Sequence, residues 1–281
     1  MKALKAAQIT QAVSVLVRQA NFVLRKDCLA ALRNAHQREN NKRAKNILQA
    51  ILDNAAYAKK AGLAICQDTG MPVVFAQVGA DLKIAGNLTE AINRGIGEGY
   101  RKYSLRNSIV ADPLTRGRSG FIPGVVHTEI VPGNKLKLIL LPKGFGCENK
   151  SQTKMFKPTA GLEEIKQFIV EAVKAAGPDA CPPYVVGVGI GGTADYSALL
   201  AKKALLKKIH LKRGGFPKGN LPSLERDLLV KINSLKIGPM GLGGKTTALA
   251  VHILTYPTHI AGLPVSVNIS CHALRSAEIT L

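Results

Sequence analysis

Five cysteines are the residues of this chain with the clearest capacity for chemistry. They are Cys28, Cys66, Cys147, Cys181 and Cys271. An odd number of thiols at wide spacings favours a cytosolic chain with reduced or metal-binding thiols over a disulfide framework. The chain has no CxxC pair, which argues against a zinc ribbon or a thioredoxin-type motif.

The segment that follows Cys66 gathers further reactive groups. Gln67 and Asp68 stand directly after this thiol, in a polar turn between two apolar stretches. Packing gives no reason to hold a thiol, an amide and a carboxylate together, so the turn is a candidate site. The alternative is an Asx turn in which Asp68 bonds the local backbone. The same two interpretations apply to KGFGCENKS at 143–151, where glycines let the backbone approach a neighbour closely.

Two glycine-rich segments resemble nucleotide-binding loops. Gly187, Gly189 and Gly192 form GxGxxG after an apolar stretch, but no acidic residue lies between Asp195 and Glu225 to bind a ribose. A tight strand-to-helix turn explains these glycines equally well. GPMGLGGKTT has Pro239 where a P-loop needs its first glycine, and proline lacks the N–H that would face a phosphate. Another kind of anion-binding turn stays open there.

The histidines differ in their surroundings. His127 and His252 lie in apolar stretches with strand character, where a structural histidine is the favoured interpretation. His259 lies between Pro257 and Gly262, in a loop that favours an exposed functional histidine.

Composition bounds the class of protein. The chain has 281 residues, 46% of them hydrophobic and 20% charged, which predicts a globular protein with a sizeable core. Its formal net charge of +21 favours anionic partners. A nucleic-acid-binding module is a distant alternative, because aromatic residues make up only 5% and the basic residues are scattered. The basic run 37–45 is interpreted as a solvated turn, and neither a membrane span nor a signal peptide is expected.

The elements that must position these residues are read from periodicity and caps. Helices are predicted over the first sixty residues up to Gly62, from Asn87 to Tyr103, from Leu162 to Ala176, after Thr193, and from Ser223. Strands are predicted on both sides of the turn at 67–70, as a hairpin around residues 132–134, and at 184–190. Residues 211–220 are expected to form a basic loop. The fold class is mixed α/β (α+β). We expect one domain, 1–281, in which a helical part, 1–62, packs on a mixed-sheet part, 63–281.

Seven segments, taken in order, resemble a known family. They are ICQDTG, LRNS, KGFGCENKS, ACPPYVVGVGIGGT, GLGGKT, PTHIAG and NISCHALR. The chain resembles the alpha subunit of class I fumarate hydratases, and L-tartrate dehydratase alpha subunits are very similar. The resemblance covers nearly the whole chain and implies an iron–sulfur hydro-lyase domain.

The resemblance implies an oxygen-sensitive [4Fe–4S] cluster. Its three ligands would be Cys66, Cys181 and Cys271, which leaves one iron open as a Lewis acid. Cys147 departs from the family, which often has a small residue there. We expect it not to bind iron, because a fourth thiolate would close the catalytic site. Cys28 is expected to be a packing cysteine.

The resemblance also implies the substrate contacts. The matching residues are Gln67, Asp68, Arg106, Gly146 and His259. Arg106 would bind a substrate carboxylate in a bidentate fork, Gly146 would offer its N–H, and His259 would contact the substrate near the cluster. Asp68 would be the catalytic residue that handles a proton on the hydroxyl side.

The implied reaction is the reversible hydration of fumarate to L-malate, as in the tricarboxylic acid cycle. Dehydration of L-tartrate is the close alternative. The chain stops ten residues after Cys271, so the resemblance implies a separate beta subunit, in an αβ or α2β2 enzyme of the cytoplasm. We expect the alpha chain to be inactive by itself and to bind neither nucleic acid nor membrane.

Overall fold

The computed structural model describes residues 3–210 and 220–281 as a mixed α/β protein, which confirms the predicted fold class. Contacts group the chain into two compact units. The first unit comprises Met1–Arg25, Ala55–Phe145 and Arg275–Leu281, and the second comprises Lys26–Asn54 and Gly146–Leu274. The single-domain organisation stays a prediction.

The elements of the first unit begin with β1 (Leu4–Lys5) and α1 (Ala6–Phe22). After the end of α3 (Lys42–Ala61) come β2 (Met71–Gly79), β3 (Ile84–Ala85), α4 (Leu88–Lys102), β4 (Ile109–Asp112), β5 (Arg116–Gly120), β6 (Val125–Val131), β7 (Leu136–Lys143) and, at the C-terminus, β12 (Ala277–Thr280). The predicted N-terminal helices are therefore present.

The elements of the second unit include α2 (Lys26–Arg38) and the first part of α3. They continue with the short helix α5 (Phe145–Glu148), β8 (Gln152–Phe156), α6 (Leu162–Ala176), β9 (Tyr184–Gly192), α7 (Ala194–Ala204), α8 (Asn220–Asn233), a 3-10 turn (Pro239–Gly241), β10 (Ala248–Thr258) and β11 (Leu263–Ser270).

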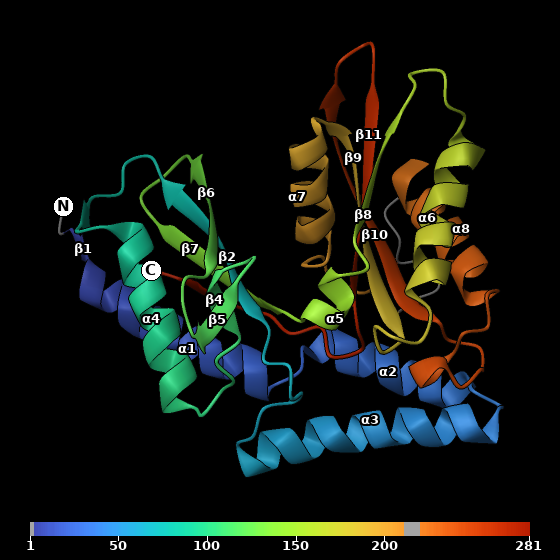
Figure 1. The fold of residues 1–281 in the computed structure, drawn as a ribbon, viewed down its shortest axis with the longest axis horizontal. Coiled ribbons are helices and arrows are strands. Elements are labelled where there is room, and N and C mark those ends of the chain that lie inside the picture. The colour runs from blue at the N-terminus through green and yellow to red at the C-terminus, as the bar shows by residue number, and fades with distance from the viewer. Residues whose placement is uncertain (1–2, 211–219) are drawn as a thin grey trace. The chain divides into compact units, whose positions relative to one another are not determined.

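The first unit is built on a four-stranded sheet with the order β12-β7-β2-β6. β2 pairs in parallel with β6 and antiparallel with β7, which in turn pairs antiparallel with β12. Helices α1 and α4 pack on each other, and α1 packs on β7 and β12 (Figure 1). The core between them is apolar, with Ile9, Leu16, Ile92 and Leu138 fully buried.

The predicted hairpin around residues 132–134 is wrong. Its two strands, β6 and β7, are separated by β2, which bonds both of them. The end of β2 fills the gap: Gly79 N–H donates to Lys135 O at 2.8 Å, and Ala80 N–H donates to Val131 O at 2.8 Å. A Cβ on Gly79 would lie 2.4 Å from Gly133 O, so a glycine is needed where the loop crosses the strand end.

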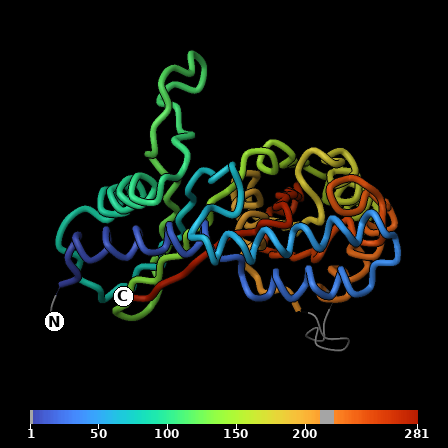
Figure 2. The backbone as a smooth tube through the Cα atoms, turned by 90° about the horizontal axis from the view of Figure 1, so that it is seen from below, coloured from blue at the N-terminus to red at the C-terminus, as the bar shows by residue number. Residues whose placement is uncertain are grey.

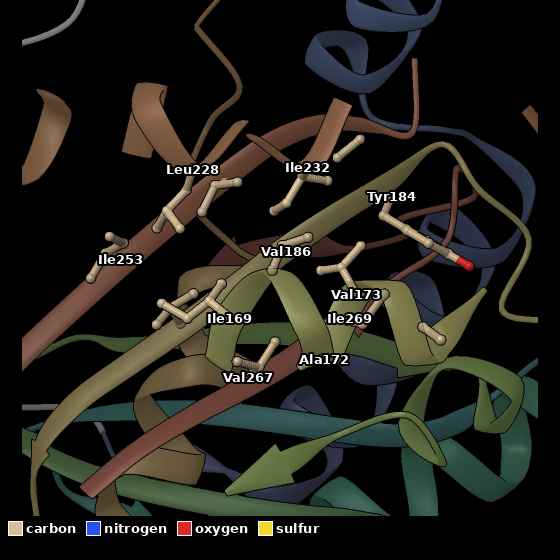
Figure 3. Packing of buried hydrophobic residues seen from close by; sticks show 14 of the residues in the cluster. Ile169, Ala172, Val173, Tyr184, Val186, Leu228, Ile232, Ile253, Val267 and Ile269 are labelled. Carbon is tan, nitrogen blue, oxygen red and sulfur yellow. The ribbon is translucent and has the colours of Figure 1, made fainter. Parts of the chain in front are cut away.

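The second unit contains a sheet with the order β10-β9-β11-β8 and helices on both faces. α7 covers one face, and α6 and α8 cover the other (Figure 1). Figure 3 shows the apolar layer under α6 and α8, where Ile169 and Val173 meet Val186, Val267 and Ile269. This layer is the main core of the second unit.

Helix ends follow local sequence in most places. Asn87 caps α4 as predicted, because its side chain accepts the Glu90 N–H at 3.1 Å. Thr193 stands at the start of α7 as predicted, although its side chain makes no cap bond to the backbone. Two expectations are wrong: residues 63–66 form no strand, and Ser223 lies inside α8, which begins at Asn220. Most of the predicted basic loop, 211–219, lies outside the described residues.

Strands β4 and β5 form a hairpin that extends away from the rest of the first unit (Figure 2). Residues 111–118 are all exposed, and Leu114 at the tip is 89% exposed. Within the parts of the chain that the structure describes, no helix is both long enough and apolar enough to cross a membrane.

Candidate active site

Burial divides the five cysteines into two groups. Cys28 and Cys147 are buried, and the other three are partly exposed. The Cys28 thiol lies 3.8 Å from the carbonyl oxygen of Leu274. The Cys147 thiol lies 3.3 Å from that of Ala180 and belongs to the core of the second unit. Both contacts are typical of packing cysteines. The partly exposed thiols are Cys66, Cys181 and Cys271.

Two of the partly exposed cysteines lie on neighbouring loops of the second unit. Cys181 precedes β9 and Cys271 follows β11, and the adjacent ends of these strands pair at Val185 and Ser270. His272 fixes the two loops together, because its N–H and its Nδ1 lie 3.4 Å and 3.1 Å from the Cys181 carbonyl oxygen. The second unit therefore brings these two thiol-bearing segments together.

The third cysteine, Cys66, lies in the first unit, in the turn before β2. Its thiol lies 3.2 Å from Oε1 of Gln67. In the described residues, no group of three or more His, Cys, Asp and Glu side chains forms a metal site. The cysteines nevertheless suit an iron–sulfur cluster, because the three partly exposed thiols lie on loops. The other two cysteines, Cys28 and Cys147, are buried and pack in the interior.

Asp68 is held by backbone groups on both carboxylate oxygens. Oδ1 accepts the N–H of Gly70 at 2.9 Å, and Oδ2 accepts the N–H of Phe145 at 2.8 Å. The first bond is the Asx turn expected from the sequence. The second ties the side chain to the segment after β7 and fixes its direction. Each oxygen keeps a lone pair for a proton or a hydroxyl group.

Glycines allow this turn to lie against the end of β7. Gly70 has φ +75°, and a Cβ there would lie 2.7 Å from the carbonyl carbon of Pro142. A Cβ on Gly144 would lie 3.2 Å from Oδ2 of Asp68. Close backbone approach therefore requires a glycine at position 70, and Gly144 leaves room beside the Asp68 carboxylate.

Arg106 is attached to the same turn through its main chain. Its N–H donates to the Thr69 hydroxyl at 3.1 Å, and that hydroxyl lies 3.4 Å from the Arg106 carbonyl oxygen. Its side chain is exposed, as is that of Gln67. The first unit therefore brings together Gln67, Asp68 and Arg106, three of the predicted substrate residues.

Gly146 lies in α5 and begins the second unit's central stretch. Two residues further on, Glu148 binds Lys202 of α7 and accepts a bond from Asn268 of β11 at 3.0 Å. The acidic part of the KGFGCENKS motif therefore fastens α5 to the sheet and to α7.

His259 lies at the other end of the sheet from the cysteine loops of its unit. Thr258 pairs with Gly192 at the end of β9, whereas Cys181 precedes the start of β9. A strand of nine residues separates the two ends by roughly 25–30 Å at about 3.3 Å per residue. The structure does not bring His259 together with Cys181 and Cys271 in this unit, and its substrate contact stays a prediction.

The two nucleotide-like loops have structural explanations. A Cβ on Gly189 would lie 2.0 Å from Ser197 O, so the GxGxxG glycines let α7 lie directly on β9. In the GLGGKT loop, the Lys245 N–H donates to Oε2 of buried Glu39 at 2.7 Å. Oε1 of Glu39 accepts two more N–H groups, from Asn40 and Asn41. The anion that this loop binds is a carboxylate of the same unit.

Comparison with known proteins identifies the family. Residues 10–280 match the family described as Fumarate hydratase (Fumerase). The chain belongs to this family. A protein of Methanocaldococcus jannaschii, named provisionally as L(+)-tartrate dehydratase subunit alpha, is 40% identical over 278 residues, or 96% of each chain. The L(+)-tartrate dehydratase subunit alpha of Escherichia coli K12 is 28% identical over 276 residues, which cover 97% of this chain and 90% of that protein.

Membership of the Fumarate hydratase family confirms the resemblance and places the chain among hydro-lyases. The assignment of individual site residues stays a prediction. Two buried residues of this family member were not predicted as site residues. Nη2 of Arg275 donates to the Asp68 carbonyl oxygen at 2.7 Å, and the Tyr100 hydroxyl donates to the Thr69 carbonyl oxygen at 2.9 Å. Burial raises the pKa of Tyr100 above its usual range, so the hydroxyl stays protonated.

A signal for Arg275 existed in the sequence, because it closes the NISCHALR motif four residues after Cys271. Its role depends on an acceptor that lies 207 positions earlier in the chain, which periodicity does not reveal. Tyr100 carried no such signal, since an aromatic residue on an amphipathic helix is ordinarily part of the core.

Proposed function

We propose that this chain is the alpha subunit of an iron–sulfur hydro-lyase that interconverts fumarate and L-malate. The observation that carries the proposal is the turn after Cys66, where Asp68 is fixed by two backbone N–H groups beside exposed Gln67 and Arg106. A thiol and a carboxylate on this turn, with the guanidinium of a segment bonded to it, suit a dicarboxylate substrate next to a cluster.

The cofactor of the proposal is a [4Fe–4S] cluster held by three thiols. These are Cys66, Cys181 and Cys271. When bound, the cluster supplies an iron without a protein ligand, which polarises the substrate's C–O bond as a Lewis acid. The partial exposure of these three thiols, against the burial of Cys28 and Cys147, supports this choice of ligands.

The remaining chemistry falls to side chains of the chain. The Arg106 guanidinium binds a substrate carboxylate through two parallel N–H groups, and Gln67 orients the substrate with its amide. In the hydration direction, an oxygen of Asp68 takes a proton from the water that adds. In the dehydration direction, the same oxygen returns it to the departing hydroxyl. The backbone donors from Gly70 and Phe145 keep this carboxylate from rotating.

The partner in the proposal is a beta subunit that supplies the proton-transfer group for the carbon atom. The names of the relatives, which call them alpha subunits, support such a partner. The same names favour a second candidate reaction, the dehydration of L(+)-tartrate. L-malate and L(+)-tartrate differ by one hydroxyl group, and the residues that distinguish them are not assigned.

Anaerobic purification and substitution of single cysteines test the cluster. Changing Cys66, Cys181 or Cys271 to Ser should abolish the visible absorbance and the stoichiometric iron and sulfide. Changing Cys28 or Cys147 to Ser should leave the cluster in place, because these thiols pack against carbonyl oxygens in the interior. Loss of the cluster in Cys147→Ser but not in Cys181→Ser would reject the ligand set.

Turnover by the alpha chain reconstituted with its beta subunit decides between the substrates. Higher kcat/KM for fumarate than for L-tartrate supports the first candidate, and the reverse order supports the second. Equal failure with both substrates, in a complex that holds its cluster, would reject both reactions.

A further inference from the structure

Arg275 is a buried cation at a point where the chain changes unit. It is 3% exposed and is the first residue of the first unit's C-terminal segment, directly after Leu274 of the second unit. A buried guanidinium is costly unless its N–H groups find acceptors. The acceptors that Arg275 uses therefore indicate what it is there to hold.

One of these acceptors lies on the turn that carries Cys66 and Asp68. Nη2 of Arg275 donates to the main-chain carbonyl oxygen of Asp68 at 2.7 Å. This bond is short and charge-assisted, and it constrains the peptide between Asp68 and Thr69. The Tyr100 hydroxyl lies within 3.1 Å of the next two carbonyl oxygens, those of Thr69 and Gly70. Three successive carbonyl groups of the turn are thus held by two buried side chains.

The second acceptor holds the other side of Cys66. Nη1 of Arg275 donates to Oδ1 of Asn21 at 3.3 Å, and the Asn21 main-chain carbonyl oxygen accepts the Ile65 N–H at 3.0 Å. Asn21 is itself fully buried at the end of α1. Arg275 therefore braces the turn on both sides of Cys66: directly at Asp68, and through Asn21 at Ile65.

Phe145, at another boundary between the units along the chain, also bonds Asp68. Phe145 is the last residue of the first unit before Gly146, and its N–H donates to Oδ2 of Asp68 at 2.8 Å. Asp68 is thus bonded at its carbonyl oxygen by Arg275 and at its carboxylate by Phe145. Each of these two residues is the residue of the first unit next to a boundary with the second unit. Gly144 leaves room for this carboxylate, since a Cβ there would lie 3.2 Å from Oδ2 of Asp68.

We propose that Arg275 is a positioning residue of the active site, which fixes the turn from Cys66 to Gly70 and thereby the directions of the Asp68 carboxylate and the Cys66 thiol. Because Arg275 is buried, the proposal gives it a role through the turn rather than in contact with substrate. Its effect on the turn is a property of the chain itself, and its effect on turnover rests on the proposed function.

Hydrogen exchange of the full chain without cluster tests the effect on the turn. The amides to follow are those of Gly70 and Phe145, whose N–H groups bond the Asp68 carboxylate. In Arg275→Met, both amides should exchange roughly tenfold faster or more, the effect of losing one charge-assisted hydrogen bond. Arg275→Lys, which keeps a cationic donor, should show a smaller acceleration.

Asn233→Ala is the matched control. Its side chain also bonds buried backbone, accepting the N–H groups of Thr247 and Ala248 at 2.7 Å and 2.9 Å, but it lies in the second unit. The control should leave the exchange of Gly70 and Phe145 unchanged. If Arg275→Met exchanges at these amides as the wild type and the control do, the proposal is overturned. If Arg275→Met does not fold, the same comparison with Arg275→Lys decides.

Turnover by the complex with the beta subunit gives an independent readout. A positioning role predicts that Arg275→Lys lowers kcat at least tenfold with KM changed less than threefold, because Arg106 still binds the substrate. The opposite pattern, a raised KM with wild-type kcat, would contradict it. If the wild-type complex holds no cluster, the proposed function fails, while the exchange test of Arg275 keeps its meaning.

Discussion

The two faces of the β10-β9-β11-β8 sheet in the second unit carry different types of residue. On the face towards α6 and α8, β9 contributes Val186 and Val188 to the apolar core. On the face towards α7, the alternate residues are Gly187 and Gly189, which have no side chain to interpose. Because side chains alternate between the two faces of a strand, the stretch YVVGVGIGG provides apolar packing on one face and close backbone packing on the other.

β11 repeats this division. Val265, Val267 and Ile269 belong to the apolar core, while the intervening residues include buried Ser266 and Asn268. The Ser266 hydroxyl lies 2.7 Å from that of Ser197 in α7, and Asn268 bonds Glu148, the partner of Lys202 in α7. One face is therefore stabilised by burial of apolar area, and the other by close backbone contact and polar bonds.

Gly189→Ala should have the largest effect on stability, because it adds a side-chain atom on the sheet face where α7 packs directly against the backbone. The added Cβ would lie 2.0 Å from Ser197 O and 2.7 Å from Ala201 N, both of them backbone atoms. Relief requires α7 to move, and we expect a loss of about 3–5 kcal/mol in the free energy of unfolding. Urea unfolding measures it.

Gly161→Ala is the control for that substitution, since no atom lies within 4 Å of its added Cβ and its φ is −75°. It should change the free energy of unfolding by less than about 1 kcal/mol. Equal destabilisation by the two changes would show that α7 is not held by close backbone contact.

Ile169→Ala removes apolar contacts on the sheet face covered by α6 and α8. Ile169 is a fully buried residue of α6 that faces the sheet (Figure 3), and its truncation should cost about 2–4 kcal/mol through lost burial and a cavity. Leu162→Ala in the same helix is matched to it, because Leu162 is 54% exposed, and it should cost less than about 0.5 kcal/mol. Thermal or urea unfolding of both variants checks the difference. Similar losses would mean that burial does not distinguish the two positions.

Glu163→Gln should have the smallest effect, since it touches only the exposed side of α6 and α8. Hydrogen bonds from Lys166 and Lys231 lower the pKa of Glu163 from its usual 4.5 to about 2. A carboxylate whose pKa is lowered by folding stabilises the folded state above about pH 4.5, and this contribution disappears as the pH falls towards 2. Urea midpoints at several pH values should therefore converge for wild type and variant in that window.

Lys231→Gln removes one of the two donors to Glu163, so it should also lower the urea midpoint above about pH 4.5, by a smaller amount. A constant difference between wild type and Glu163→Gln down to pH 2 would contradict this assignment.

Much of this protein follows from local sequence. The cap at Asn87, the end of α6 at Gly177 and the alternation of β9 are set by neighbours within a few residues, so they were predictable. Cys66, Cys181 and Cys271 stand in motifs that identify the family without any structure. The Asx turn at Asp68 is local as well, because Oδ1 bonds the N–H two residues on.

The rest depends on partners far away in the chain. β6 and β7 look like a hairpin in the sequence, but β2, more than forty residues earlier, offers both of them a better set of backbone bonds. Oδ2 of Asp68 finds its donor 77 positions away, and Glu39 fills the GLGGKT loop from 206 positions away. Sequence by itself determined the family and the candidate site residues, because the motifs that carry them are short and local. Tertiary structure decided which donor each carboxylate and carbonyl meets, because buried polar groups take whichever partner the packing brings within 3 Å or so.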